Sequence, residues 1–250
     1  MTVPTVSLQA ASIVPSRSWT GPRQAMRGVR EMVPANQAGN AGALPSPRPD
    51  LLTEDYDIAL SRAFVLDSGE RLTKPFLRLR LTRSARTRLD APVIAVAGGI
   101  SADRQVTANG DTGQGGWWSG VVGVGAGIDL DRFQVISFDF LPNEDEQATT
   151  LSTADQARAM AHALDVLGIR RLAAFVGASY GGMVALAFAE QHGDRLERLA
   201  VISAADRPDP MATAWRGIQR RIVAFALECG DPERGLALAR ELAMTTYRAP

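Results

Sequence analysis

A serine in the second half of the chain has the neighbours that a nucleophilic serine requires. Residues 177–181 read Gly-Ala-Ser-Tyr-Gly, a Gly-x-Ser-x-Gly motif centred on Ser179. The apolar run 172–176 precedes the motif, and a segment with an apolar helical pattern follows it. A strand, a sharp turn and a helix in this order hold the serine in a strained backbone conformation, and glycines flank it because side chains there would collide with neighbouring elements. The pattern therefore predicts an exposed serine nucleophile, whose chemistry is acyl transfer.

Two places in the sequence could supply the N–H groups that stabilise negative charge on a reacting carbonyl oxygen. The first is the backbone N–H of Tyr180, because this residue opens the helix after Ser179 and lies at the positive end of the helix dipole. The second is the segment Ala-Gly-Gly-Ile-Ser at 97–101, which follows an apolar run at 93–97. A flexible glycine-rich loop without function is the alternative interpretation of this segment.

The chain is short of the groups that would activate the serine. An activated serine needs a histidine within about 2.6–3.2 Å and a carboxylate that orients the histidine. The sequence contains two histidines, His162 and His192. His192 follows Ser179 at a distance of roughly 20 Å along a helix, and His162 falls inside the preceding helical segment, so neither is expected to be the base. The usual order of serine, carboxylate and histidine is therefore incomplete in residues 1–250.

Composition excludes several classes of partner. The 27 Lys and Arg residues balance the 27 Asp and Glu residues, and no long run of either sign occurs, so neither nucleic acid nor an anionic membrane is expected as a partner. No apolar stretch approaches the roughly 20 residues that cross a bilayer. One cysteine, Cys229, and two histidines provide neither an internal disulfide nor a metal-ligand cluster. We expect a cytoplasmic, metal-free protein that binds small molecules.

The order of the predicted elements indicates an α/β fold with a mostly parallel sheet. Residues 57–66 and 75–83 are predicted to form two strands of a hairpin at a sheet edge. From residue 92 onwards, short apolar runs alternate with helical segments, as in β-α-β units whose strands are buried on both faces. The expected strands are 93–97, 133–138, 172–176 and 199–203, and the expected helices are 153–167, 180–191, 211–229 and 232–246.

The chain divides into three predicted regions. Residues 1–48 are rich in Pro, Ser, Gly and Ala and are expected to be a disordered tail. An organelle transit peptide is the alternative, because residues 1–30 contain four arginines and no acidic residue. Residues 49–205, with the serine motif on a strand–turn–helix, are typical of the amino-terminal part of an α/β-hydrolase core. Residues 206–250 are predicted to be a segment of a helical lid over the sheet.

Further blocks of sequence resemble the homoserine O-acyltransferases, the acetyl- and succinyltransferases of methionine biosynthesis. The matching blocks are Gly-Trp-Trp at 116–118, then 128–133, 167–172, Gly-Gly-Met at 181–183, 219–220, 235–240 and 246–248. They run in family order over residues 91–250, roughly two thirds of the chain. Gly-Gly-Met and Gly-Trp-Trp are far more specific than the serine motif alone, so the chain resembles this family and not merely the fold.

The resemblance implies a two-step transfer without a cofactor other than the co-substrate. Ser179 would take an acyl group from acyl-CoA and pass it to the hydroxyl of L-homoserine. Ile100 and Tyr180 would provide the oxyanion N–H groups.

The resemblance also implies a substrate tunnel. Arg220, Tyr247 and Arg248 would line the homoserine tunnel under the lid, where an arginine could pair with the carboxylate of the amino acid. A solvated helix face is the alternative for each arginine. The oligomeric state is open, with a homodimer as one alternative.

Three departures from the family pattern leave alternatives open. The chain passes through 142–146 almost directly to the next helix, where the family has a long Gly- and Thr-rich loop, so the sequence does not decide between an acetyl and a succinyl donor. Tyr180 stands where the family usually has Met, which leaves its backbone N–H intact. Without the carboxylate and the histidine only weak residual catalysis is expected. One alternative is a general esterase or thioesterase. The other is a non-catalytic remnant that pairs with a partner chain, beside the unpaired strand 199–203, or that only binds ligand.

Overall fold

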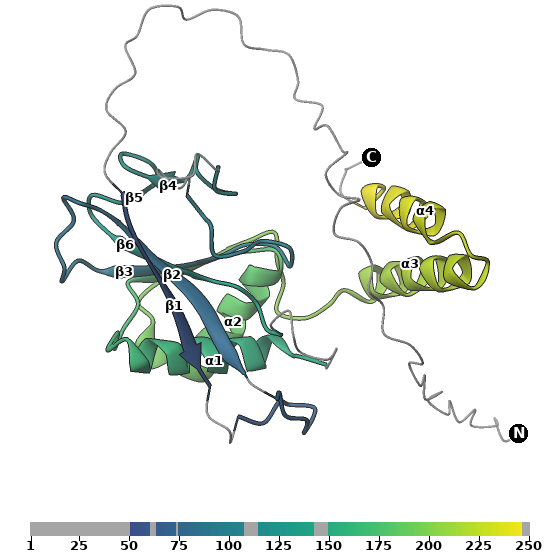
Figure 1. Ribbon diagram of the computed structural model, residues 1–250, viewed down its shortest axis with the longest axis horizontal. Coiled ribbons are helices and arrows are strands. Elements are labelled where there is room, and N and C mark those ends of the chain that lie inside the picture. Colours follow the sequence, from purple (N-terminus) through teal and green to yellow (C-terminus); the bar gives the residue numbers. More distant parts are fainter. Residues whose placement is uncertain (1–50, 61–63, 74, 108–114, 143–149, 247–250) are drawn as a thin grey trace, which may run out of the picture. The chain divides into compact units, whose positions relative to one another are not determined.

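The computed structural model describes residues 51–60, 64–73, 75–107, 115–142 and 150–246 (Figure 1). The predicted tail, residues 1–48, lies outside these residues. The described elements form a six-stranded sheet in the order β1-β2-β6-β3-β7-β8, together with a two-stranded sheet and helices. This arrangement confirms the predicted α/β class.

Four neighbouring strands of the large sheet are parallel. They are β6 (Gln134–Phe138), β3 (Val93–Ala97), β7 (Ala174–Ala178) and β8 (Leu199–Ile202). Ala95 and Ala97 of β3 belong to one hydrophobic cluster, whereas Ile94 and Val96 belong to another. Because successive side chains of a strand point to opposite faces, an uninterrupted apolar run suits a strand that is covered on both faces. The four strands lie close to their predicted positions.

The antiparallel hairpin is present, but its first strand differs from the prediction. β1 (Leu51–Ala59) pairs with β2 (Phe76–Ser84), and β2 pairs in turn with β6. The prediction of a strand at 57–66 was therefore wrong in its extent. Asp55 and Asp57 of β1 form ion pairs of 2.7 and 3.1 Å with Arg80 and Arg78 of β2. These pairs between opposite residues help to hold an acidic strand at the edge of the sheet.

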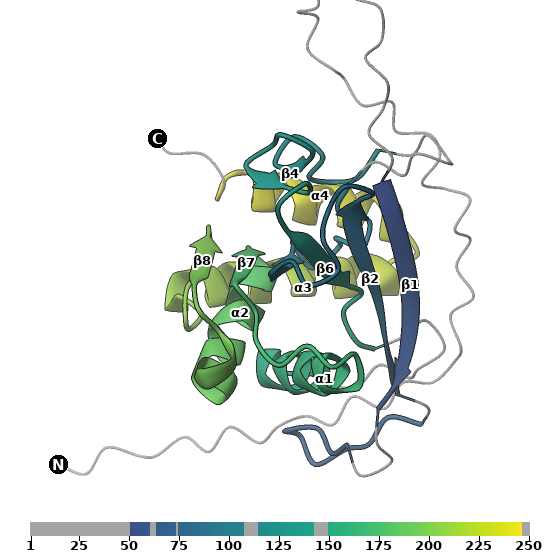
Figure 2. The same cartoon turned by 90° about the vertical axis from the view of Figure 1, so that its left-hand side faces the viewer.

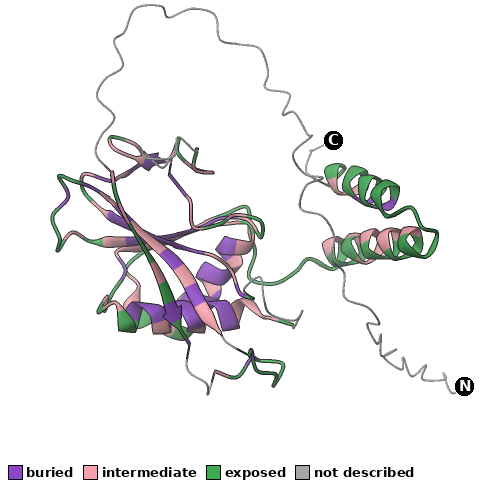
Figure 3. Ribbon diagram, viewed as in Figure 1, coloured by how far each residue is buried: buried purple, intermediate pink, exposed green. Residues whose placement is uncertain are grey.

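Helices α1 (Thr153–Val166) and α2 (Tyr180–His192) pack against each other and against one face of the sheet. Ser152 caps α1: its hydroxyl accepts the N–H of Asp155, and the Asp155 carboxylate accepts the N–H of Ser152. Met160 and Phe188 are fully buried. Figure 3 shows burial concentrated in this layer of strands and helices, whereas much of the surface of α3 and α4 is exposed.

The described residues between β3 and β6, 98–107 and 115–133, pack against the opposite face of the sheet. They contain β4 (Val122–Gly123) and β5 (Ile128–Asp129), which form a small parallel sheet. The second hydrophobic cluster joins these residues to the strands, and its buried members are Ile94, Val96, Val106, Val122, Ile128, Leu130 and Val135. The sequence patterns did not predict β4 and β5, since each is only two residues long.

Two consecutive helices end the described part of the chain. α3 (Pro210–Glu228) and α4 (Pro232–Met244) each begin with a proline after an aspartate cap, and they pack against each other. Gly230 between them has a φ of 75°, which favours glycine. The two helices confirm the predicted segments 211–229 and 232–246, while their place over the sheet stays a prediction. None of the helices in the described residues is long and apolar enough to cross a membrane.

Candidate active site

Ser179 lies in the turn between β7 and α2, with φ 53° and ψ −120°. Residues other than glycine seldom adopt a positive φ, and holding one there costs about 1–3 kcal/mol. The Ser179 N–H donates a 2.9 Å hydrogen bond to the carbonyl of Ile202 on β8, and the Ser179 carbonyl accepts the N–H of Gly182. The serine is exposed. The turn therefore presents the hydroxyl at the carboxyl edge of the sheet, and the role of Ser179 as nucleophile stays a prediction.

The two glycines that flank Ser179 have no room for a side chain. A Cβ on Gly177 would overlap the backbone of Gly181, and a Cβ on Gly181 would overlap the backbone of Ala97 and Gly98. The Gly181 N–H donates a 2.8 Å hydrogen bond to the Gly98 carbonyl. The serine turn, residues 177–181, and the loop after β3, residues 98–104, therefore meet backbone against backbone.

The two candidate oxyanion donors belong to these two segments. Tyr180 is the first residue of α2, so its N–H has no acceptor within the helix. Ile100 is the second residue of a turn that the Ala102 N–H closes on the Gly99 carbonyl at 2.8 Å, and the second residue of such a turn does not use its N–H to close it. The Gly98–Gly181 contact brings both segments to the edge where Ser179 lies, and the assignment of both residues as oxyanion donors remains a prediction.

The side chain of Tyr180 is partly buried and packs against the hydrophobic core. Its ring packs edge-on against Phe140, with the ring centroids 4.8 Å apart. Burial raises the pKa of the Tyr180 hydroxyl, and a hydrogen bond with Gln156 partly offsets this effect. The hydroxyl is therefore protonated at neutral pH, and the residue anchors the start of α2.

An ion-pair network holds the loop after β3 from a second side. The Arg104 N–H donates to the Asp139 carboxylate at 2.8 Å, and its guanidinium contacts Asp139 at 2.5 Å and Asp55 at 3.3 Å. A hydrogen bond from Arg80 and the charges of Arg80 and Arg104 hold the pKa of Asp55 below its usual value. Sequence reasoning missed this network, because its four members come from four separate strands or loops.

Trp117 packs directly under the loop after β3. A Cβ on Gly98 would lie 2.9 Å from the Trp117 ring, and the Trp117 Nε1–H donates a 2.8 Å hydrogen bond to the Asp103 carbonyl. The ring also stacks on Trp118, with the centroids 5.3 Å apart. The Gly-Trp-Trp block of the sequence therefore fixes the position of the segment that carries Ile100.

Neither histidine reaches Ser179. His192 ends helix α2, 13 residues after Ser179, which places it roughly 20 Å away along the helix axis. Burial lowers the pKa of His192, and the charge of Arg195 adds to this effect. The ring of His162 contacts the Ala59 carbonyl at 3.2 Å. The interpretation that neither residue is the base agrees with these positions.

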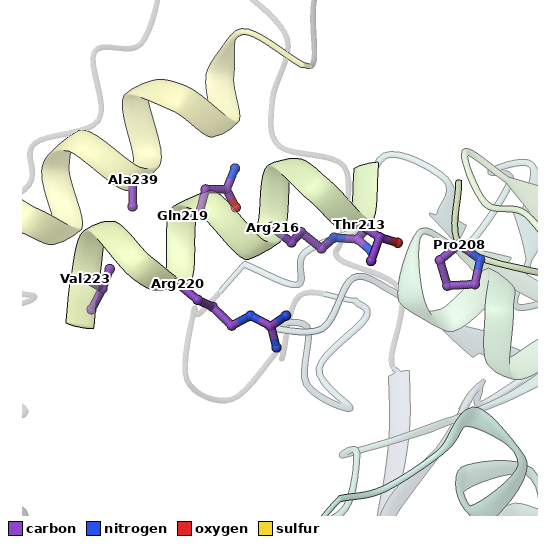
Figure 4. Close-up of a pocket in the computed structure, with 7 residues that line it drawn as sticks. All are labelled: Pro208, Thr213, Arg216, Gln219, Arg220, Val223 and Ala239. Atoms are coloured by element: carbon purple, nitrogen blue, oxygen red, sulfur yellow. The ribbon is translucent and has the colours of Figure 1, made fainter. Parts of the chain in front are cut away.

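Arg220 is the one residue of the predicted homoserine tunnel that the structure describes. It lines a pocket of about 600 Å³ with Arg216, Gln219 and Thr213 of α3 and Ala239 of α4 (Figure 4). Tyr247 and Arg248 lie outside the described residues. The role of Arg220 in binding homoserine therefore remains a prediction. The second arginine, Arg216, was missed by the sequence analysis, although it lies one helical turn before Arg220.

The described residues contain no group of three or more His, Cys, Asp or Glu side chains that could hold a metal ion.

The fold family of the chain is identified by its similarity to known proteins. The family described as alpha/beta hydrolase fold matches residues 107–246. The chain belongs to the α/β-hydrolase fold family, in keeping with its parallel strands and its strained serine between a strand and a helix. Two solved structures share the fold. An esterase E22 L374D mutant aligns with a TM-score of 0.65 at 19% identity over 80% of this chain and 62% of that chain. A homoserine O-acetyltransferase from Staphylococcus aureus aligns with a TM-score of 0.64 at 21% identity over 80% and 60%.

Curated relatives indicate a particular group of enzymes within the α/β-hydrolase fold family. A homoserine O-succinyltransferase of Xanthomonas campestris is 48% identical over 161 residues, which cover 64% of this chain and 43% of the relative. A homoserine O-acetyltransferase of Symbiobacterium thermophilum is 31% identical over 234 residues, which cover 82% and 61%. The resemblance to the homoserine O-acyltransferases is confirmed by these relatives. The chain spans about half the length of the relatives that it matches.

Proposed function

We propose that the chain carries the nucleophile half of an acyltransferase site that acylates the hydroxyl of L-homoserine. The observation that carries the proposal is the strained, exposed Ser179 at the β7–α2 turn, joined through the Gly98–Gly181 hydrogen bond to the loop with Ile100. The names of the curated relatives supply the acceptor, and both acetyl- and succinyltransferases occur among them. Acyl-CoA is the donor that we propose.

The proposed reaction has two steps. In the first, the Ser179 Oγ attacks the thioester carbonyl, the C–S bond breaks, and CoA leaves as the thiol with the serine proton. In the second, the homoserine hydroxyl attacks the new ester, the bond between the acyl carbon and Ser179 Oγ breaks, and the proton returns to the serine. The N–H groups of Tyr180 and Ile100 would stabilise the oxyanion in both steps.

The first step of the proposed reaction requires a base that accepts the Ser179 proton. Neither His162 nor His192 is placed to accept the Ser179 proton, so no histidine of this sequence serves as the base. Oxyanion stabilisation and binding alone leave catalysis of about 10³- to 10⁴-fold over water. We therefore expect this chain by itself to acylate slowly and to transfer little product.

Acylation of Ser179 is the direct test. The purified chain is incubated with acetyl-CoA or succinyl-CoA, and intact mass spectrometry with peptide mapping locates any acyl group. We expect a slow, single modification at Ser179 that is absent in Ser179→Ala. The control variant Ser68→Ala removes another exposed serine and should be modified like the wild type. Modification at several sites, or modification that persists in Ser179→Ala, would contradict the proposal.

A further inference from the structure

A second serine at the same edge of the sheet has the same unusual backbone. Ser203, directly after β8, has a φ of 51°, and Ser179 has a φ of 53°. Within the described ranges these are the two residues other than glycine with a positive φ. Such outliers persist where the surrounding structure fixes them, and they cluster at functional sites.

The register of the sheet makes the two serines neighbours. β7 and β8 are parallel and lie side by side (Figure 2), and Ala178 is paired with Ile202. The next positions along the two strands are Ser179 and Ser203. Adjacent strands are about 4.8 Å apart, and the Ser179 N–H bonds to the Ile202 carbonyl. A group bound to the Ser179 Oγ is therefore within reach of the Ser203 side chain.

The chain on both sides of Ser203 packs closely against α2. A Cβ on Gly182 would lie 2.7 Å from the Ala204 Cβ and 3.3 Å from the Val201 Cγ1. The residue after Ser203 is thus packed tightly over the first turn of α2. Glycine or asparagine would suit a positive φ better than serine. Ser203 is exposed, and its hydroxyl makes no hydrogen bond to any residue that the structure describes. The hydroxyl therefore does not stabilise the described fold through a hydrogen bond.

The strand order places Ser203 opposite the proposed oxyanion donor. β7 lies between β3 and β8. Ile100 follows β3, and Ser203 follows β8. When the carbonyl oxygen of an acyl group on Ser179 points toward Ile100, on the β3 side, the space on the β8 side is available to the other groups that approach the acyl carbon. The attacking acceptor is one of these groups.

We infer that Ser203 binds the acceptor alcohol, with its hydroxyl hydrogen-bonded to the hydroxyl of a hydroxy-amino acid that attacks the acyl group on Ser179. The inference rests on the proposed function. A serine hydroxyl both donates and accepts hydrogen bonds, so it can orient an alcohol without taking its proton. Ser203 would act on acceptor binding and would leave acyl uptake unchanged.

Acceptor binding is the readout that separates this role from a structural one. Titration calorimetry measures the dissociation constants of L-homoserine and of L-2-aminobutyrate, which lacks the hydroxyl. We expect Ser203→Gly and Ser203→Ala to weaken L-homoserine binding about 2- to 10-fold, the range of one neutral hydrogen bond, without changing L-2-aminobutyrate binding. Ser203→Asn tolerates the positive φ and keeps a polar group, so it should recover most of the affinity. Ser68→Ala should match the wild type.

The melting temperature is a second readout, and it should change in the opposite direction to the affinity for L-homoserine. Ser203→Gly relieves the strained backbone and should raise the melting temperature while it weakens L-homoserine binding. If Ser203 were purely structural, its replacement would lower both the melting temperature and the affinity. Equal affinity of wild type and Ser203→Gly for L-homoserine, or no binding of L-homoserine to the wild type, overturns the inference. Loss of acyl uptake in Ser203→Ala with full L-homoserine affinity would place Ser203 against the donor and overturn it as well. Absence of acyl uptake in the wild type counts against the proposed function alone, since the binding comparison still decides the role of Ser203.

Discussion

The backbone N–H of Gly181 donates a hydrogen bond of 2.8 Å to the carbonyl oxygen of Gly98, and this contact joins the serine turn to the loop after β3. Neither glycine contributes a functional group, yet each stands two residues from a proposed catalytic position. The approach is possible because Gly181 has no side chain, since a Cβ there would overlap the backbone of Ala97 and Gly98. The relative position of Ser179 and Ile100 therefore depends on a glycine pair.

Substitution of Gly181 by alanine is expected to break this contact. The new Cβ would overlap the backbone of Ala97 and Gly98, and backbone cannot move aside as a flexible side chain can. Overpacking of this kind should lower the free energy of unfolding by about 2–3 kcal/mol, measured by urea denaturation. Gly193→Ala is the matched control, because nothing lies within 4 Å of a Cβ there and its φ is −60°. Equal stability of the two variants would show that Gly181 does not lie this close to the backbone of Ala97 and Gly98 in solution.

Substitution of Ser179 by glycine should make the chain more stable. The serine is held at a φ of 53°, and glycine removes most of that strain, although it adds backbone entropy to the unfolded state. We expect a net gain of about 1 kcal/mol in the free energy of unfolding. Ser179→Ala keeps a Cβ and should leave stability close to that of the wild type. A glycine variant no more stable than the alanine variant would mean that the turn is unstrained in solution.

The sequence was sufficient to predict the parallel strands and the helices, because their signals are local. Apolar runs, the Ser152 cap and the prolines of α3 and α4 lie within the elements that they define. β7 was predicted two residues too early. The last two residues of the strand, Gly177 and Ala178, pair with Ala97 and Ile202, and only a known register shows that the strand includes them.

The parts that the sequence did not predict depend on contacts between distant segments. β1 carries Glu54, Asp55 and Asp57, a composition that disfavours a strand until the arginines of β2 are placed opposite. The Arg104–Asp139 pair joins residues 35 positions apart. Likewise, the positive φ of Ser203 has no sequence signal, and it occurs where Ala204 lies close to Gly182 of a distant segment.

Substitution of Trp117 by phenylalanine should loosen the loop after β3. The variant loses the hydrogen bond from Nε1 to the Asp103 carbonyl and part of the ring surface against Gly98. We expect a loss of about 1–2 kcal/mol in the free energy of unfolding and slower acylation of Ser179, because Ile100 is held less firmly. Stopped-flow measurement with an activated ester would follow the acylation step. Trp215→Phe on α3 is the control, and an equal slowing in both variants would contradict a local effect at the loop.

Acidification should destabilise the chain through His192. Burial against Phe188, the largest cause, and the charge of Arg195 lower the pKa of His192 in the folded chain, while Asp194 and Asp165 partly oppose them. In the unfolded chain the pKa is about 6.5, so between this value and the lowered one the unfolded state binds more protons. The free energy of unfolding therefore falls as the pH decreases through this window and levels off below the folded pKa.

Urea denaturation between pH 8 and pH 5 would measure this contribution. His192→Gln cannot take up the proton and should flatten the dependence across that window, whereas His162→Gln retains His192 and should keep it. The carboxylates give a separate signal, because the pKa of Asp67 is lowered chiefly by hydrogen bonds from Ser152 and Arg158. That contribution is present above about pH 3.9 and is lost as the pH falls through the folded pKa, so it lies below the histidine window. A pH dependence that survives in His192→Gln between pH 5 and pH 7 would assign it to another group.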